Sequence, residues 1–176
     1  MSSFRVVVTD QVFPDIDVER GLVESAGGSI EVASGTRDEV LDAARGADAL
    51  LNTYFALDAV AIAGLEKCRI IARYGIGVDN VDLEAARAAG IAVTNVPDYC
   101  VEEVATHTIA LILGLVRRIP QGDILVRGGD WGVARLGAPR RFSTLTVGLL
   151  GYGKSARQVA EIMIALGTRV IVHHPS

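Results

Sequence analysis

The sequence predicts an α/β protein built on parallel sheets, and three observations support this fold class. Short apolar segments alternate with segments of helical periodicity five times over about 100 residues. The apolar segments are hydrophobic on both faces, which is typical of strands in a parallel sheet that helices cover on both sides. Near the end of the chain, a strand, a glycine-rich turn, a helix and another strand follow one another over residues 144–176.

Residues 1–101 are predicted to form one complete domain. Thr36 can cap the second helix, and Gly46 and Gly90 end the second and fourth helices. This alternation predicts right-handed crossovers and a single parallel sheet in a flavodoxin-like arrangement, which we expect to be the substrate domain. The expected strands are 4–8, 30–33, 49–52, 69–73 and 91–94, and the expected helices are 17–25, 36–44, 57–65 and 83–89.

Residues 102–176 are predicted to form the first part of an NAD(P)-binding Rossmann domain, truncated after its second strand. The long helix expected near 101–118 is apolar almost all round, so we expect it to be buried between domains or against a partner. Cys100 and Glu103 have the spacing of a capping box at its start, although cysteine is a poor cap. Residues 120–143 are expected to be irregular.

Composition limits the classes of function. The net charge is −4 and no basic block is present, which argues against nucleic acid as a direct partner. The longest apolar stretch, 104–116, is shorter than the ~20 residues that span a bilayer, so no membrane segment is expected. Cys68 and Cys100 fit no metal-ligand spacing and suit a reducing compartment. We therefore expect a cytoplasmic protein without a metal site.

The turn at 151–156 has the pattern G-x-G-x-x-A in the context that a dinucleotide site requires, between a strand and a helix and before a second strand. Gly151 would allow the tight turn. Gly153 would let a diphosphate approach the backbone, and Ala156 would let the helix pack closely on the strand. The alternative is an ordinary strand–turn–helix connection in which the glycines only satisfy local geometry.

The residue expected to contact the ribose of the cofactor is His174. A dinucleotide fold usually has Asp or Glu at the end of its second strand, about 20 residues beyond the glycines, and His173 and His174 occupy this region here. A histidine can hydrogen-bond a hydroxyl, and the missing carboxylate removes a repulsion against a 2′-phosphate. The choice between NAD and NADP therefore stays open. Alternatively, both histidines are ordinary surface residues at a strand end.

Four motifs carry a resemblance to a known family. They are Arg73–Asp82, which is similar to the signature R-x-G-x-G-x-D-N-[IV]-D, and then Gly90–Pro97, Glu102–His107 and Val147–Gly153. In this order and spacing they resemble the D-isomer-specific 2-hydroxyacid dehydrogenases, above all the phosphoglycerate dehydrogenase-like members and the corepressors called C-terminal binding proteins. The resemblance covers essentially the whole chain and implies the N-terminal half of such a protein.

The resemblance implies two binding sites. In the first, backbone N–H groups near Gly77 and Val78 hold the substrate carboxylate, and Ile76 faces the nicotinamide. In the second, the diphosphate lies along the glycine turn, where Ser155 departs from the family's usual apolar residue as His174 departs from its usual Asp. The implied substrate-binding residues are Tyr74, Gly75, Ile76, Gly77 and Val78. The implied cofactor-binding residues are Ile76, Gly151, Tyr152, Gly153, Lys154, Ser155, Ala156 and His174.

A purely structural interpretation of the first site remains open. In this alternative, residues 74–78 are a strand end followed by a sharp turn, and Asp79 and Asn80 hydrogen-bond the turn backbone. Both interpretations can hold together.

The family's chemistry implies three catalytic groups: an arginine that polarises the substrate, a histidine that acts as acid and base, and a carboxylate that orients the histidine. In the family they lie in the later part of the Rossmann domain, so we expect them beyond Ser176 and assign no catalytic residue here. His107 is expected to have a packing or hinge role in a buried helix. Whether the chain by itself is an enzyme is left open.

The expected function is hydride transfer between NAD(P) and a small 2-hydroxy or 2-keto acid, with the isolated chain inactive. The alternatives are a non-catalytic NAD(P)-sensing or dimerising module related to the corepressor branch, and a decayed paralogue that only dimerises. A homodimer through 101–118 is expected in every case. We also expect 144–176 to be less stable than 1–101, because two strands with open edges are marginal in water.

Overall fold

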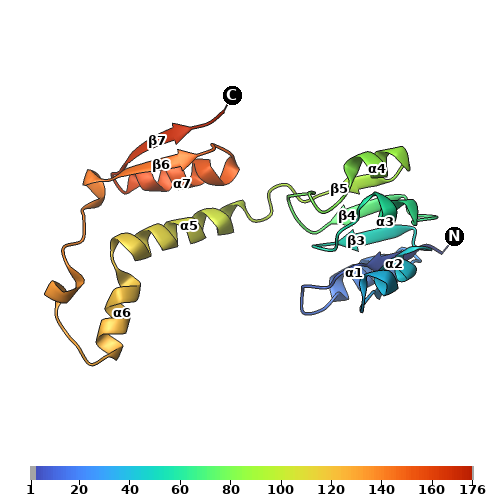
Figure 1. The fold of residues 1–176 in the computed structure, drawn as a ribbon, viewed down its shortest axis with the longest axis horizontal. Coiled ribbons are helices and arrows are strands. Elements are labelled where there is room, and N and C mark those ends of the chain that lie inside the picture. Colours follow the sequence, from blue (N-terminus) through green and yellow to red (C-terminus); the bar gives the residue numbers. More distant parts are fainter. Residues whose placement is uncertain (1–2, 176) are drawn as a thin grey trace. The chain divides into compact units, whose positions relative to one another are not determined.

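The computed structural model describes residues 3–175. The chain divides into two compact units, Met1–Tyr99 and Cys100–Ser176, and each unit has its own parallel sheet (Figure 1). The α/β fold class is therefore confirmed. None of the helices among residues 3–175 is both long enough and apolar enough to cross a membrane.

The first unit is built on a five-stranded parallel sheet in the order β2-β1-β3-β4-β5. This is the flavodoxin-like order expected from the alternation of strands and helices. The strands are β1 (Arg5–Val8), β2 (Ser29–Val32), β3 (Ala49–Asn52), β4 (Ile70–Arg73) and β5 (Ala92–Thr94), and the helices are α1 (Asp17–Ser25), α2 (Arg37–Ala44), α3 (Ala59–Ala63) and α4 (Leu83–Ala88).

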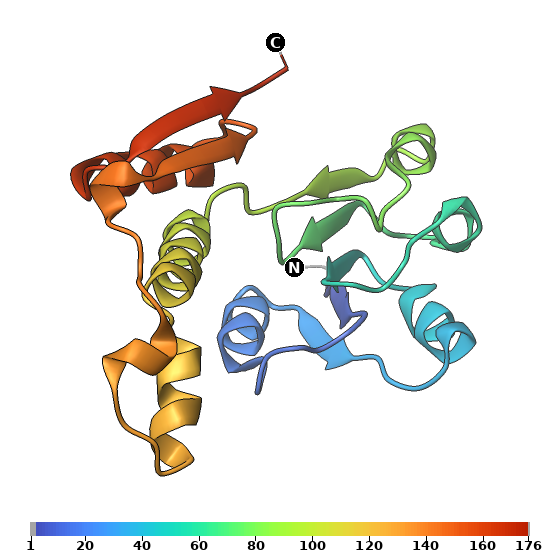
Figure 2. The same ribbon diagram turned by 60° about the vertical axis from the view of Figure 1, so that its left-hand side comes forward.

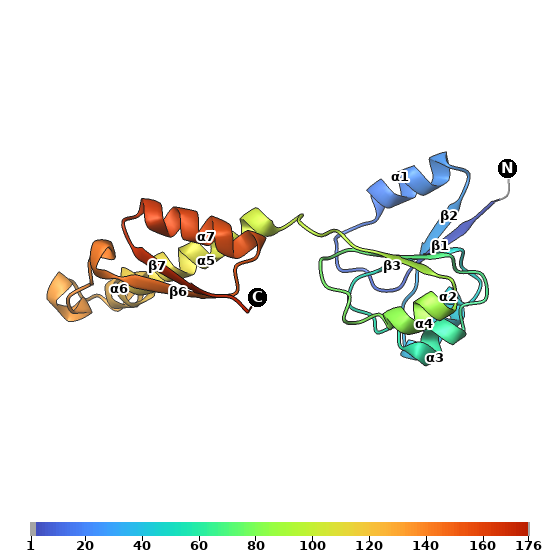
Figure 3. The ribbon, with the colours of Figure 1, turned by 90° about the horizontal axis from the view of Figure 1, so that it is seen from above.

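Helices cover both faces of this sheet. The helices α2, α3 and α4 lie on one face and α1 lies on the other (Figures 2 and 3). Because side chains alternate along a strand, Val7 packs with the core under α2–α4, whereas Val6 and Val8 pack with the core under α1. Both cores are apolar, which explains why the strands are hydrophobic on both faces.

The second unit holds the two-stranded sheet of β6 (Thr146–Leu150) and β7 (Arg169–His173). Its helices are α5 (Val101–Val116), α6 (Ile119–Arg127) and α7 (Lys154–Ala165), with short 3-10 turns at Val133–Leu136 and Phe142–Thr144. One face of the sheet packs on a core that contains Ala105, Ile109 and Met163. On the other face, the side chains of Leu150 and Ile171 are 90% and 48% exposed.

The expectation that residues 120–143 are irregular is wrong in its first part. Residues 119–127 form a helix, because Arg118 turns the chain in the left-handed region (φ +55°) and the following proline lies in the first helical turn, where no N–H is needed. The side chain of Cys100 makes no capping bond at the start of α5. In α5, Leu111 and Leu115 are 56% and 69% exposed within the chain, and the expected burial of this helix between domains or against a partner stays a prediction.

Candidate functional site

The first candidate site lies at the carboxyl edge of the five-stranded sheet. In a parallel sheet the carboxyl ends of all strands meet at one edge, so the loops that follow β1, β3, β4 and β5 gather there. The turn at 74–80 follows β4, which pairs with β3 on one side and with β5 on the other. The sheet thus places this turn between two neighbouring loops.

Asp10 holds the loop that follows β3. Its carboxylate accepts hydrogen bonds from the backbone N–H groups of Thr53 (3.0 Å), Tyr54 (2.6 Å) and Phe55 (3.2 Å). The sequence analysis missed this residue, although a carboxylate directly after a buried strand was the signal available. These three hydrogen bonds fix the backbone of residues 53–55, next to the 74–80 turn.

Asn52 and Asn80 tie the same loop to the turn. The Asn80 Nδ2 atom donates to Asn52 Oδ1 (2.7 Å) and to the Phe55 carbonyl (3.0 Å), and Asn52 is fully buried. The purely structural alternative had Asn80 bonding the backbone of its own turn, but its amide reaches the neighbouring loop instead. Arg73 Nε donates to Asn80 Oδ1 (3.0 Å) and braces the turn from within.

Several carbonyl groups of the turn accept hydrogen bonds, whereas two neighbouring N–H groups have no acceptor among the described residues. The Gly75 carbonyl accepts from the Val96 N–H (3.0 Å), and the Ile76 carbonyl accepts from Asn95 Nδ2 (2.7 Å). No acceptor among residues 3–175 takes the backbone N–H of Gly77 or Val78. Adjacent free N–H groups in a turn can hold an anion, and Gly77 is exposed.

Tyr74 is directed away from the turn towards α1. Its backbone N–H donates to the Asn52 carbonyl (2.8 Å), and its hydroxyl donates to Glu19 Oε1 (2.8 Å). The ring meets Phe13 edge to face, with centroids 5.6 Å apart. Burial, and then the hydrogen bond and negative charge of Glu19, raise the pKa of the Tyr74 phenol, so it stays neutral and donates.

The second candidate site is the glycine turn that precedes α7. Gly151 has φ +90°, a conformation that favours glycine, and its N–H donates to the His173 carbonyl (2.8 Å). Gly153 differs, because its φ of −74° suits any residue and a Cβ there would meet nothing within 4 Å. Local geometry thus explains Gly151 and leaves Gly153 unexplained.

Free N–H groups also follow the glycines. Gly153 caps α7 without a side-chain bond, and the N–H groups of Ser155 and Ala156 in the first turn meet no acceptor in the described part of the chain. Lys154 is the first residue of the helix. This end of a helix carries partial positive charge and suits a diphosphate.

Arg157 was missed by the sequence analysis. Its guanidinium lies 5.5 Å from the centre of the Tyr152 ring, and its Nε donates to the Tyr152 carbonyl (3.2 Å). Together these contacts hold Tyr152 at the turn. A cation one helical turn after a glycine turn was the signal available.

All three histidines belong to the second unit. His174 follows His173, the last residue of β7. Because His173 pairs with Leu150, the residue before the glycine turn, His174 lies near that turn. His107 is exposed within the chain, and its expected packing or hinge role stays a prediction. Among residues 3–175, no group of three or more His, Cys, Asp or Glu side chains could hold a metal ion.

These features define a two-unit α/β protein with a turn that has free N–H groups at a sheet edge and a Rossmann-type glycine turn at a helix start. The chain belongs to the D-isomer specific 2-hydroxyacid dehydrogenase family, because the model of that family's catalytic domain matches residues 6–171. The family resemblance of the sequence motifs is thereby confirmed.

Relatives of known structure and sequence agree. The D-3-phosphoglycerate dehydrogenase of Mycobacterium tuberculosis is 34% identical over 179 residues, which are 99% of this chain and 33% of the relative. The TT0316 protein of Thermus thermophilus has a TM-score of 0.86 and 35% identity, covering 98% of this chain and 56% of that one. The NAD+-bound 3-phosphoglycerate dehydrogenase of Entamoeba histolytica has a TM-score of 0.73 and 27% identity, with coverages of 99% and 55%.

This chain thus spans about a third of the length of its mycobacterial relative and about half of each solved chain.

Proposed function

We propose that this chain binds a nicotinamide dinucleotide at 151–156 and the carboxylate of a small 2-hydroxy or 2-keto acid at 75–78, as part of a D-2-hydroxyacid dehydrogenase. Gly153 carries the proposal. Its backbone needs no glycine and its Cβ position is open, so the absence of a side chain there serves something that approaches from outside. A diphosphate over the start of a helix is such a group.

The residues have distinct tasks in this proposal. When bound, the nicotinamide supplies or accepts the hydride. The N–H groups of Gly77 and Val78 hold the acid's carboxylate and so orient the carbon that reacts, and Ile76, whose side chain is 43% exposed, borders the nicotinamide. The N–H groups of Ser155 and Ala156 hold the diphosphate.

His174 leaves both nucleotides as candidate ligands. It occupies the place where a carboxylate would otherwise repel the 2′-phosphate of NADP. Titration of the chain with NADH and with NADPH, followed by calorimetry, compares the two directly. Affinities within about tenfold of each other, equivalent to 1.4 kcal/mol, are expected.

Replacing Gly153 tests the nucleotide site. Gly153→Ala places a methyl group where the diphosphate is to approach, and we expect the Kd for NADH to rise about tenfold or more. Gly21→Ala is the matched control. A Cβ at this position also meets nothing within 4 Å, and Gly21 belongs to α1, outside the glycine turn. An unchanged Kd in Gly153→Ala, or no binding of either nucleotide to the native chain, contradicts the proposal.

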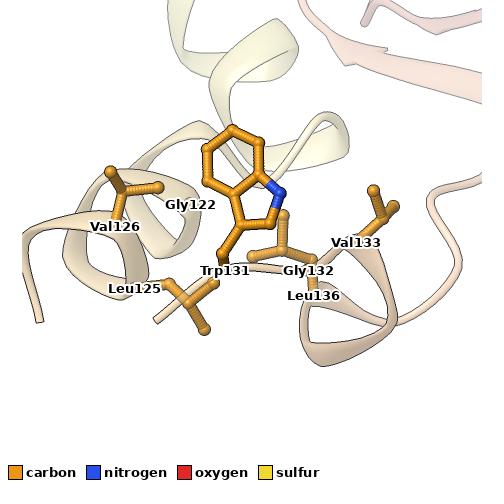
Figure 4. Close-up of a pocket in the computed structure, with 7 residues that line it drawn as sticks. All are labelled: Gly122, Leu125, Val126, Trp131, Gly132, Val133 and Leu136. Atoms are coloured by element: carbon orange, nitrogen blue, oxygen red, sulfur yellow. The ribbon is translucent and has the colours of Figure 1, made fainter. Parts of the chain in front are cut away.

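We also propose that the chain forms a homodimer through the Trp131 patch, the apolar surface of α6 and the following turn. Figure 4 shows the Trp131 indole between side chains of α6 and of the 3-10 turn, beside a pocket of about 230 Å³. Trp131 is 86% exposed, and contiguous exposed apolar surface of this kind marks interfaces. The residues of the patch are Gly122, Leu125, Val126, Trp131, Gly132, Val133 and Leu136.

Sedimentation tests the dimer. Trp131→Ser should raise the dimer dissociation constant at least about tenfold, because a large aromatic side chain leaves the interface. Val60→Ser, at an 81% exposed position on α3, is the control. A native chain that is monomeric, or a Trp131→Ser variant that dimerises equally well, contradicts this assignment.

The same patch favours a second candidate function, a dimerising NAD(P)-sensing module without turnover. Both functions require nucleotide binding, so turnover separates them. Oxidation of NADH in the presence of a 2-keto acid, measured on the longest natural form of the protein, supports the dehydrogenase, and binding without oxidation supports the sensing module.

A further inference from the structure

The loop that follows β5 holds two consecutive peptide units of the 74–80 turn by their carbonyl groups. The Val96 N–H donates to the Gly75 carbonyl (3.0 Å), and Asn95 Nδ2 donates to the Ile76 carbonyl (2.7 Å). Asn95 is exposed, and a single hydrogen bond from an exposed side chain contributes little to the stability of a fold. The consequence of the Asn95 bond is therefore to be found in the turn itself.

The Ile76 carbonyl and the Gly77 N–H belong to the same peptide unit. A peptide unit is planar, and in its trans form the C=O and the N–H point in opposite directions. This peptide bond is trans, so the bond that holds the Ile76 carbonyl on Asn95 also directs the Gly77 N–H away from Asn95. No acceptor among residues 3–175 takes this N–H, and Gly77 is exposed. The direction of a free donor is thus set by a side chain on the neighbouring loop.

The same bond makes the Gly77 N–H a stronger donor. A hydrogen bond to the carbonyl oxygen draws electron density through the conjugated peptide unit and polarises the N–H at its other end. Hydrogen bonds that follow one another in this way strengthen each other. An anion bound at the Gly77 N–H would therefore complete a chain that begins at the Asn95 amide.

The charged side chains beside the turn offset one another. A Cβ on Gly75 would collide with the guanidinium of Arg73, and a Cβ on Gly77 would lie 3.4 Å from Asp79 Oδ2. One cation and one anion thus border the two glycines, and their effects on a bound carboxylate have opposite signs. The attraction that remains comes from the N–H groups of the turn, so the strength of each donor matters.

We propose that Asn95 is a positioning residue for the carboxylate of the 2-hydroxy or 2-keto acid, because it directs and polarises the Gly77 N–H through the Ile76 carbonyl. The inference rests on the proposed function, since it takes the 75–78 turn as the carboxylate site. Asn95 does not touch the acid in this proposal and acts through one peptide unit.

NMR spectroscopy of the isotope-labelled 176-residue chain tests the inference, because it observes the Gly77 and Val78 N–H groups directly. The probe is oxamate, which has the carboxylate and the adjacent carbonyl of a 2-keto acid but accepts no hydride, and NADH is present throughout. In the native chain oxamate should move both amide proton signals downfield, since a carboxylate is a strong acceptor. The titration gives the Kd for oxamate.

Three variants of Asn95 separate positioning from folding. Asn95→Ala should raise the Kd for oxamate about five- to tenfold, because the Gly77 N–H loses its fixed direction and its polarisation. Asn95→Asp, which cannot donate and adds a negative charge, should weaken oxamate at least as much. Asn95→Gln keeps the amide donor and should restore part of the affinity. All three should keep the native urea midpoint and the native Kd for NADH, because the Val96 bond still holds the turn.

A measurement without oxamate tests the polarisation alone. In Asn95→Ala the Gly77 amide proton signal should move upfield, since its peptide unit has lost the hydrogen bond at the carbonyl. Gln11→Ala is the matched control for both measurements. Gln11 is also exposed, and its Nε2 donates to a backbone carbonyl, that of Phe13 (3.1 Å), in the loop that follows β1. Its replacement should change neither the Gly77 signal nor the Kd for oxamate.

The outcomes separate the two proposals. If oxamate moves the Gly77 and Val78 signals of the native chain but binds Asn95→Ala with the native Kd, or if Asn95→Gln binds as weakly as Asn95→Ala, the positioning role is overturned and the carboxylate turn stands. If oxamate moves neither signal in the native chain, the proposed carboxylate site fails and the positioning role fails with it.

Discussion

At the scale of single residues, the first candidate site depends on hydrogen bonds between polar side chains that are buried or partly buried. Asn52 is fully buried, yet its amide donates to Thr9 Oγ1 (3.0 Å) and to the Phe55 carbonyl (2.9 Å) while its oxygen accepts from Asn80. No buried side-chain nitrogen or oxygen of the described residues lacks a partner. Removing one side chain of this network would leave the polar atoms of its partners without a hydrogen bond. The free-energy cost of such an unsatisfied buried atom exceeds the net contribution of the hydrogen bond itself.

Asn80→Ala should therefore destabilise the chain by about 2 kcal/mol. It removes the donor to Asn52 Oδ1 and the acceptor for Arg73 Nε in one step. Urea denaturation followed by circular dichroism measures the loss. Asn95→Ala is the control, because exposed Asn95 makes one bond, to the Ile76 carbonyl (2.7 Å), and should cost less than about 0.5 kcal/mol. Equal losses in the two variants would show that burial of the pair contributes nothing.

At the scale of elements, three of the four helices of the first unit begin at local side-chain caps, whereas α1 begins at Ile16 without one. Thr36 and Glu39 form a full capping box at the start of α2, and Asp58 and Asp82 cap α3 and α4. Such caps satisfy N–H groups that no helical carbonyl reaches. They also explain why the start of α2 could be predicted from Thr36 alone.

The capping box makes the stability of α2 depend on pH. Hydrogen bonds from the Thr36 backbone and side chain lower the pKa of Glu39 below its ordinary value of 4.5. A lowered folded-state pKa means that the carboxylate stabilises the fold above about pH 4.5 and that this contribution disappears as the pH falls through the lowered value. The stability difference between the native chain and Glu39→Gln should therefore shrink between about pH 6 and about pH 3.

Urea denaturation at several pH values measures this difference. Glu161→Gln, at an exposed position on α7, is the control and should follow the native chain in parallel. A difference for Glu39→Gln that is constant over the whole range would contradict the role of the carboxylate.

At the scale of the whole molecule, the two units differ in how completely their sheets are covered. In the first unit β1, β3 and β4 are paired on both sides, and helices cover both faces. In the second unit each strand has one partner, and Leu150 is 90% exposed on the uncovered face. Strands with open edges and little burial open locally at low free energy.

Backbone amides of β6 and β7 should therefore exchange with deuterium at least about 100-fold faster than those of β1 and β3 in the 176-residue chain. Exchange followed by mass spectrometry resolves the four strands. NADH should slow exchange around the glycine turn, since a ligand that binds only the folded form stabilises it. Uniform protection across both units would refute the expected difference in stability.

The amino-acid sequence by itself determined the parallel sheet of the first unit, the family and the glycine turn, because each depends on short-range patterns. Apolar segments alternate with helical ones, and Gly151 and Gly153 stand between a strand and a helix. The sequence did not determine α6. This helix begins after Arg118, whose backbone adopts the left-handed conformation, and residue propensities do not predict that conformation for an arginine.

Only the tertiary structure decided what surrounds the first site. Asp10 reaches Tyr54, 44 residues away, and Asn80 reaches Asn52, 28 residues away. The direction of Tyr74, towards Glu19 and Phe13, was likewise absent from any local pattern. The physical reason is that periodicity reports which residues are buried in a strand or helix, whereas a hydrogen bond between loops depends on which strands become neighbours in the sheet.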